Sequence, residues 1–174
     1  LFHDAVPSAF IKRVFAVMQE SPQHTFQVLT KRAERLEELS NKLQWPANVW
    51  MGVSVESSDY KYRVDHLRRT SASTKFVSLE PLLGPLDQLD LQEIDWASVG
   101  GESGPAARPI SIDWVRSIRD QCIDANVAFH FKQWGGQNKK KAGRLLDGRT
   151  WDEWPNSKDQ VMRTNANSSS KEAI

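Results

Sequence analysis

Short apolar runs alternate with amphipathic stretches along most of this chain. The runs occupy residues 25–31, 49–56, 75–81, 96–103 and 129–135. They are rich in Val and Phe and apolar at successive positions, which is typical of strands buried on both faces of a parallel sheet. Between the runs, apolar residues recur every three or four positions and predict helices over 8–20, 31–43, 59–70 and 112–125. The alternation predicts an α/β fold built from βα units.

The length limits how far such units can close. A complete (β/α) barrel takes about 250 residues, whereas this chain has 174. A partial (β/α) barrel of parallel strands, resembling part of a TIM barrel, fits this length. The chain opens at Leu1 without an initiator methionine, so we expect an N-terminally truncated fragment of such a barrel.

The pattern changes after residue 135. The stretch 145–151 (LLDGRTW) predicts a hairpin that turns at Asp147-Gly148. Earlier, the stretch 82–95 lacks helical periodicity and is interrupted by Gly84-Pro85, so we expect an irregular cover there. The expected organisation is a partial barrel over 1–135, a basic and aromatic hairpin extension over 136–154 and a disordered, Ser- and Asn-rich tail over 155–174.

Composition excludes several classes of protein. The chain is 39% hydrophobic with a formal charge of +1, which suits one globular domain and excludes a strongly basic nucleic-acid clamp. A single cysteine, Cys122, argues against a disulfide framework and indicates a reducing, cytoplasmic setting. The apolar runs are too short to span a membrane, so no membrane partner is expected.

Polar residues end the strands in a repeated way. Ser54 and Glu56 end one run, Ser78 and Glu80 end the next, and a third ends in Gly100-Gly101-Glu102. The carboxyl ends of parallel strands meet at one edge of a sheet, where ligands bind. The repetition therefore predicts three carboxylates at one edge, with two glycines where a ligand could approach the backbone.

The carboxylates need positive charge nearby, because like charges in one place repel each other. Lys31 and Lys132, at two other strand ends, can supply it, and so can a metal ion or the amino group of a ligand. The candidate catalytic residues are Lys31, Glu80 and Lys132. One alternative is a Mg²⁺-dependent barrel enzyme that uses Glu56, Glu80 and Glu102 as ligands. The other is that these are cap residues and surface ion pairs at strand ends.

A second candidate surface lies in the extension. Its basic residues stand close to three tryptophans, Trp134, Trp151 and Trp154, and this combination can grip single-stranded nucleic acid. The candidate residues are Lys139, Lys140, Lys141, Arg144 and Arg149. A solvated charge run is the alternative, and a non-enzymatic nucleic-acid-binding module is the corresponding function. Cys122 falls on an apolar helix stripe, and the histidines lack metal-ligand spacing.

Several long motifs resemble one known family. They are TFQVLTKR at 25–32, FVSLEPLLG at 76–84, VGGESGPAARP at 99–109, FKQWG at 131–135 and KKKAGRLLDGRTWDE at 139–153. They are similar to the phage-encoded gp-thirty-seven/gp-sixty-eight family, a domain of unknown function, and the likeness extends from Leu1 to about residue 155. That family resembles radical S-adenosylmethionine enzymes, which use a partial barrel.

The resemblance implies a cofactor and its site. In the superfamily three cysteines hold a [4Fe–4S] cluster, and polar groups at strand ends hold S-adenosylmethionine. By position, the cofactor-binding residues would be Ser54, Glu56, Ser78, Glu80, Gly100, Gly101 and Glu102. The three-cysteine motif would lie before Leu1, so we expect this fragment to hold no cluster and to be inactive alone. The substrate is open, with nucleic acid or a partner protein as the candidates.

Overall fold

The computed structural model describes residues 1–155, so the predicted disorder of the tail lies almost entirely outside the described residues. Five strands form one sheet in which every neighbouring pair is parallel and the order is that of the chain. They are β1 (Phe26–Thr30), β2 (Val49–Ser54), β3 (Thr74–Leu79), β4 (Trp96–Gly100) and β5 (Ala128–Gln133). The predicted α/β class and parallel sheet are confirmed. Five strands do not establish a barrel.

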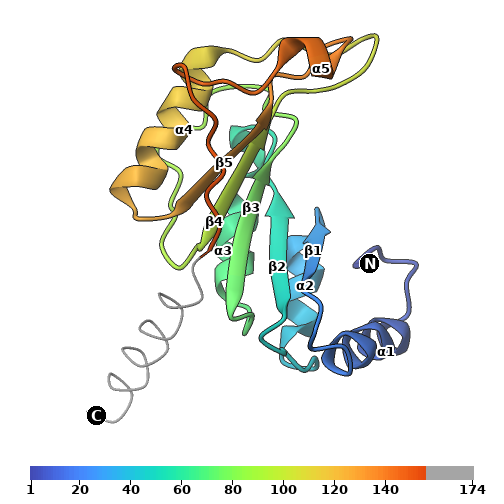
Figure 1. The fold of residues 1–174 in the computed structure, drawn as a ribbon. Helices are drawn as coiled ribbons and strands as arrows, with labels where there is room; N and C mark the ends of the chain where they lie inside the picture. The colour runs from blue at the N-terminus through green and yellow to red at the C-terminus, as the bar shows by residue number, and fades with distance from the viewer. Residues whose placement is uncertain (156–174) are drawn as a thin grey trace.

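Helices connect most of the strands. They are α1 (Ser8–Gln19), α2 (Ala33–Ser40), the short 3-10 turn η1 (Ser58–Tyr60), α3 (Tyr62–Arg68), α4 (Ile112–Asp124) and α5 (Lys139–Ala142). Figure 1 shows α2 and α3 behind the sheet, α4 beside β5 and α1 beside β1. The predicted helix over 59–70 is divided into η1 and α3, and the helix predicted over 31–43 is shorter than expected.

The two faces of the sheet differ because side chains alternate along each strand. One face carries Met51, Val77 and Phe129, which belong to a single core cluster with residues of α2, α3 and α4. The opposite face carries Phe76 and Trp96, which are buried but stand outside that cluster. We call this second face the serine face, after the row of serines described below.

The connection from β3 to β4 contains no helix, as predicted. After the cis Glu80–Pro81 peptide, the amide of Leu82 donates to the carbonyl of Gly100 over 2.9 Å, and that of Leu83 donates to the carbonyl of Glu56 over 2.9 Å. The segment then continues to Ile94, which is fully buried. These contacts hold the chain against the carboxyl ends of both neighbouring strands.

The outer edge of β5 is covered by the end of the described chain. Asp152 forms an antiparallel bridge with His130, and the amide of Phe131 donates to the carbonyl of Trp151 over 3.0 Å. The predicted hairpin precedes this segment: Leu146 and Arg149 form a bridge, and the two residues between them have φ values of 52° and 80°. Positive φ at both positions is the requirement of a type I′ turn, which Asp-Gly meets.

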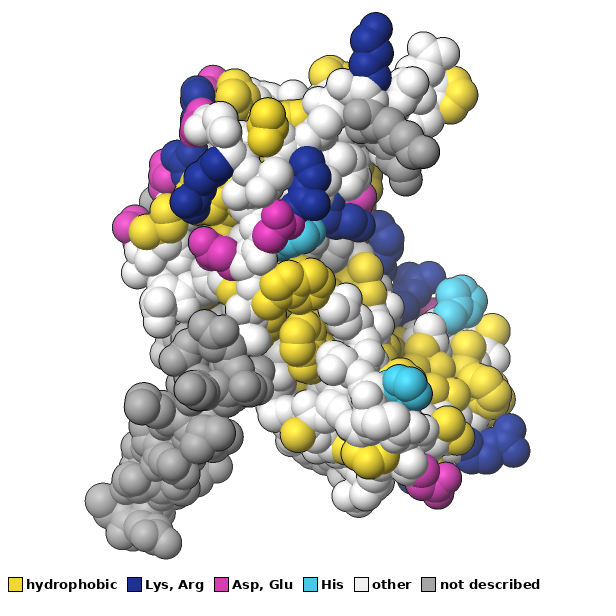
Figure 2. Space-filling view, viewed as in Figure 1, with side chains coloured by type: hydrophobic (Ala, Val, Ile, Leu, Met, Phe, Trp, Pro, Cys, Tyr) yellow, Lys and Arg dark blue, Asp and Glu magenta, His cyan; other side chains and the backbone are white. Residues whose placement is uncertain are grey.

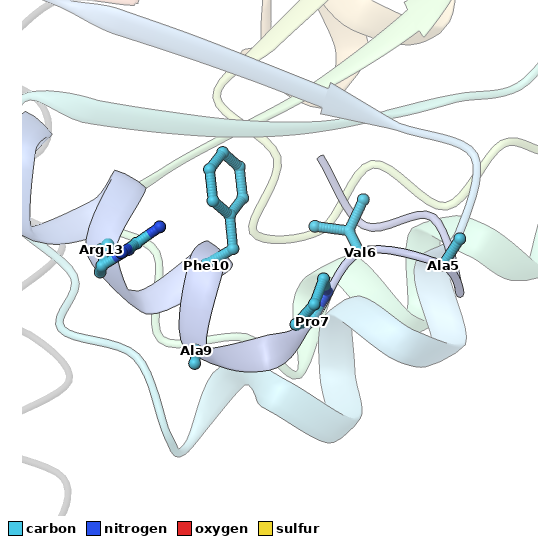
Figure 3. Close-up of a pocket in the computed structure, with 6 residues that line it drawn as sticks. All are labelled: Ala5, Val6, Pro7, Ala9, Phe10 and Arg13. Carbon is cyan, nitrogen blue, oxygen red and sulfur yellow. The ribbon is translucent and has the colours of Figure 1, made fainter.

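The outer edge of β1 differs from that of β5. Within residues 1–155 no other strand pairs with it. Beside it lies a hollow of about 520 Å³ lined by Ala5, Val6, Pro7, Ala9, Phe10 and Arg13. Figure 3 shows Phe10 and Val6 directed toward the side on which β1 runs. Leu29 on β1 is also exposed, so this edge is open and partly apolar.

Candidate functional site

The candidate site is the serine face together with the carboxyl ends of the strands. Register places Ser54 of β2 beside Ser78 of β3, Ser78 beside Ser98 of β4, and Ser98 beside His130 of β5. The three serines are buried. Because every second residue shares a face, this polar row lies between an aromatic group nearer the amino ends and charged groups nearer the carboxyl ends.

The aromatic group occupies the part of the serine face nearer the amino ends of the strands. Trp96 lies 5.6 Å from Phe76 and 6.2 Å from Trp50, measured between ring centroids. Trp154 stacks on Trp96 at 4.8 Å with an interplanar angle of 25°, and it also lies 5.4 Å from His130. Burial, together with the positive charges of Arg144 and Lys132, lowers the pKa of His130. The neutral imidazole is therefore favoured.

The first charged network joins the ends of β1 and β2. Glu56 is buried and its carboxylate forms ion pairs with Lys31 and with Arg63, the latter at 3.0 Å. Arg63 also donates to the carbonyl of Ser54 over 2.8 Å, and its guanidinium lies 4.0 Å from the ring centroid of Tyr60. Partial burial and the charge of Arg63 lower the pKa of Lys31. One buried carboxylate is thus held by two cations.

The second network crosses β4. The carboxylate of Glu80, just after β3, accepts a hydrogen bond from Lys132 over 2.5 Å and one from the side-chain amide of Gln133 over 2.6 Å. Both donors belong to β5, so the contacts pass over the end of β4 at Gly100. A Cβ atom there would stand 3.0 Å from the Gln133 nitrogen and 3.2 Å from the Glu80 carboxyl carbon. Glycine leaves room for this crossing.

The third network tethers the loop after β4. Glu102 accepts three hydrogen bonds from Arg108, two from the guanidinium at 2.7 and 2.8 Å and one from the backbone amide at 2.8 Å. These bonds lower the pKa of Glu102 to about 2. Gly101 precedes it, and a Cβ atom there would stand 2.0 Å from the carbonyl oxygen of Trp134. The second glycine therefore permits close backbone packing with the segment after β5.

The structure places all the predicted strand-end residues at one edge, but it divides the carboxylates among separate partners. Glu56, Glu80 and Glu102 each lie beyond the end of a strand and each bonds a different cation. In residues 1–155 no group of three or more His, Cys, Asp or Glu side chains is arranged to hold a metal ion. The alternative of a Mg²⁺ centre built from these three carboxylates therefore has no support in the geometry.

The lysines lie beside two of the carboxylates, and a catalytic role for Lys31, Glu80 or Lys132 stays a prediction. Lys31 and Lys132 supply the positive charge that the carboxylates need. Sequence reasoning missed Arg63, Arg108 and Ser98, which complete the networks and the serine row. A signal for Ser98 existed, because Ser98 stands two residues before Gly100, as Ser78 stands two residues before Glu80. No local signal identified Arg63 as a partner of Glu56, since it lies on α3.

The basic and aromatic extension is largely engaged within the fold. Trp134 packs on Phe131 and donates to the carbonyl of Leu145 over 2.9 Å, and Trp151 is buried beneath Arg149, whose guanidinium lies 3.5 Å from its ring centroid. Arg144 forms an ion pair with Asp152. Lys141 is exposed. Nucleic-acid binding by Lys139, Lys140, Lys141, Arg144 and Arg149 stays a prediction.

Cys122 is a core residue, as its helix stripe indicated. It is buried on α4, and burial raises the pKa of its thiol to about 12. A protonated, enclosed thiol is a poor metal ligand and a poor nucleophile. In residues 1–155 no helix is long and apolar enough to cross a membrane.

Comparison with known proteins places the chain in a family. The model of a family described as a protein of unknown function (DUF5131) matches residues 1–155, so the chain belongs to that family. No curated protein and no solved structure matches it. The match covers the whole of the described fold, including the three charged networks and the segment that covers β5.

Proposed function

We propose that this member of the DUF5131 family binds S-adenosylmethionine on the serine face of its sheet, as part of a phage-type protein related to radical S-adenosylmethionine enzymes. The observation that carries the proposal is the row Ser54, Ser78 and Ser98, placed between aromatic rings and charged groups. Ligand sites of parallel α/β folds lie at the carboxyl ends of the strands. The serine row and the charged groups lie toward that end of the strands, and the aromatic group adjoins the row on its other side.

The residues present fit the parts of this cofactor. The exposed ring of Trp154 and the half-buried ring of Trp50 offer apolar surface for an adenine, and serine hydroxyls can donate to and accept from ribose hydroxyls. Glu80 offers carboxylate oxygens to an ammonium or sulfonium group, since opposite charges attract. S-adenosylmethionine supplies a sulfonium-linked adenosyl group that a one-electron donor can cleave. This chain's residues bind and orient it.

A [4Fe–4S] cluster does not fit the residues of this chain. Such clusters are held by several cysteine thiolates, and the sequence has one cysteine, which is enclosed in the core with its pKa raised to about 12. No redox step is therefore assigned to these residues. In this proposal the cluster ligands are not residues of this sequence, and the substrate is a separate question.

Equilibrium binding tests the proposal directly. Isothermal titration of the full chain with S-adenosylmethionine should show one site. Ser78→Ala should weaken binding up to about tenfold, because it removes one hydrogen-bonding group. Glu80→Gln should weaken binding further by removing a carboxylate charge. The control is Ser117→Ala, since Ser117 lies on α4 and bonds Asp87 at the molecular surface.

Two results would overturn this assignment. One is the absence of measurable S-adenosylmethionine binding by the folded chain. The other is an affinity that Ser78→Ala and Ser117→Ala change equally, because binding would then not depend on the serine face. Circular dichroism of each variant should confirm that the fold is retained.

A further inference from the structure

Charge is distributed unevenly between the carboxyl ends and the amino ends of the strands. At the carboxyl edge, Lys31 and Arg32 follow β1, and the stretch 132–144 at and after the end of β5 holds five cationic residues and no carboxylate. At the opposite edge, the segment before β4 carries Asp87, Asp90, Glu93 and Asp95 and no cation of its own, and Arg68 and Lys75 pair with Asp90 and Glu93. A formal charge of only +1 for the chain conceals this polarity.

Three ion pairs of the carboxyl edge also share one orientation, whereas Arg63 is as enclosed as Glu56. The side chain of Lys31 is 58% exposed against 7% for its partner Glu56, and that of Lys132 is 45% exposed against 25% for Glu80. Arg108 is 58% exposed against 28% for Glu102. In each pair the carboxylate lies inside and the cation faces outward. An approaching ligand therefore meets positive charge first.

We call Lys31, Arg32, Lys132 and Arg108 the cationic rim. In Figure 2, Lys and Arg side chains form a diagonal band across the upper part of this face, from near the end of β5 toward the N-terminal segment. The inner carboxylates fix the positions of three of the four cations through the contacts described above. Fixed cations lose less conformational entropy when they bind an anion than mobile ones do.

Aromatic surface lies on the same face, below the rim. Trp154 is 49% exposed and stacks on Trp96, whose neighbour Trp50 is half-buried. Cations that track phosphates, combined with exposed rings on which bases stack, are the arrangement by which proteins bind single-stranded nucleic acid.

We propose that the cationic rim binds the phosphates of single-stranded nucleic acid and directs a nucleotide toward the serine face. The proposal names the substrate class of the site and rests on the proposed function, since the same face holds the cofactor. The cationic rim is a different surface from the basic run at 139–141, whose residues are not part of it. The rim's cations come from three places in the fold: Lys31 and Arg32 follow β1, Arg108 lies in the loop after β4, and Lys132 lies at the end of β5.

Fluorescence anisotropy of a labelled oligothymidylate, measured over a range of KCl concentrations, tests this proposal on the full chain. The logarithm of the affinity should fall linearly with the logarithm of salt concentration, by about 0.7 for each phosphate neutralised. The double variant K31Q/K132Q should bind roughly tenfold more weakly and with a shallower slope. Trp154→Ala should weaken binding about tenfold without changing the slope, because stacking involves no ion release.

The matched control is K12Q/K42Q, which removes the same two charges from exposed positions near α1 and α2. It should bind as the unaltered chain does. The proposal is overturned if the chain does not bind the oligonucleotide, or if K31Q/K132Q keeps the original slope. It is also overturned if only substitution of Lys139, Lys140 and Lys141 abolishes binding, or if heparin or phosphatidylserine vesicles compete as well as the oligonucleotide does.

The failures of the two proposals can be told apart with the same proteins. Loss of S-adenosylmethionine binding with intact, rim-dependent oligonucleotide binding removes the cofactor assignment alone. Intact cofactor binding that is sensitive to Ser78→Ala, with no oligonucleotide binding, removes the nucleic-acid assignment alone.

Discussion

At the scale of single residues, glycines decide which side chains can come together on the serine face. Gly52 lies beside Phe76 in the register of β2 and β3, and a Cβ atom at Gly52 would stand 2.4 Å from the Phe76 ring. The ring therefore occupies the space that any larger residue would need. This contact positions Phe76 against Trp96, and so determines the aromatic part of the candidate site.

Gly52→Ala should consequently destabilise the fold by about 1–3 kcal/mol, the usual cost of overpacking a core. Thermal unfolding monitored by circular dichroism measures the change. Adding Phe76→Leu should recover part of the loss, because a smaller side chain leaves room for the new methyl group. Equal stability of Gly52→Ala and the unaltered chain would contradict the arrangement of these two residues.

The pairing of Glu102 with Arg108 has a consequence for pH dependence. The carboxyl pKa is about 2 in the folded chain against a usual 4.5. A lowered pKa means that the folded state binds this proton less readily than the unfolded state. The stabilisation is therefore present above about pH 4.5 and is lost as the pH falls toward 2. Arg108→Gln should raise the pKa of Glu102 part of the way toward 4.5, because the backbone amide of residue 108 still donates to the carboxylate. A carboxyl NMR titration would show the rise, whereas an unchanged pKa would contradict the pairing.

At the scale of elements, the segment after α5 acts as an edge cover for β5. Its position depends on the type I′ turn at Asp147-Gly148 and on two arginines of α4. Arg116 contacts the carboxylate of Asp147 at 2.6 Å, and Arg119 forms a second ion pair with it. The turn places Trp151 over Phe129, with ring centroids 5.6 Å apart. The local dipeptide thus determines how a distant strand edge is covered.

Gly148→Ala should therefore cost about 1 kcal/mol, since φ is 80° at this position and L-residues are strained there. The amide of Phe131, which donates to Trp151, should exchange with solvent faster in this variant. Gly84→Ala is the matched control, because a Cβ atom at Gly84 meets nothing within 4 Å and its φ is not in the left-handed region. Similar unfolding temperatures for the two variants would show that the turn does not control the cover.

At the scale of the whole molecule, the sequence predicted what depends on local pattern. Apolar runs predicted all five strands, Asp147-Gly148 predicted the hairpin, and Gly84-Pro85 predicted the helix-free connection. Pairings between elements could not be predicted, because the partner of a side chain depends on register and on helix placement. Arg63 reaches Glu56 from α3, and Gln133 reaches Glu80 across β4. The same limit explains why three carboxylates were expected to converge and instead bond separate cations.

The open edge of β1 makes a prediction for the molecule in solution. In a parallel pair, successive amides of an edge strand point alternately toward and away from the neighbouring strand. The amide of Phe26 points toward β2, where it donates to Asn48 over 2.8 Å. Those of Gln27 and Leu29 should therefore point outward and exchange rapidly in hydrogen-exchange NMR, while that of Val28 is protected. Strong protection of Gln27 and Leu29 would mean that something covers this edge.

The contrast between the two sheet edges limits how copies of the described fold can associate. An uncovered strand edge is a template on which another strand can pair. The segment that pairs with β5 occupies one such template, and β1 leaves the other available. Each molecule then has one strand edge, that of β1, through which it can pair with another copy. Association through β1 therefore terminates at two copies, whereas a sheet with two uncovered edges propagates into a fibre.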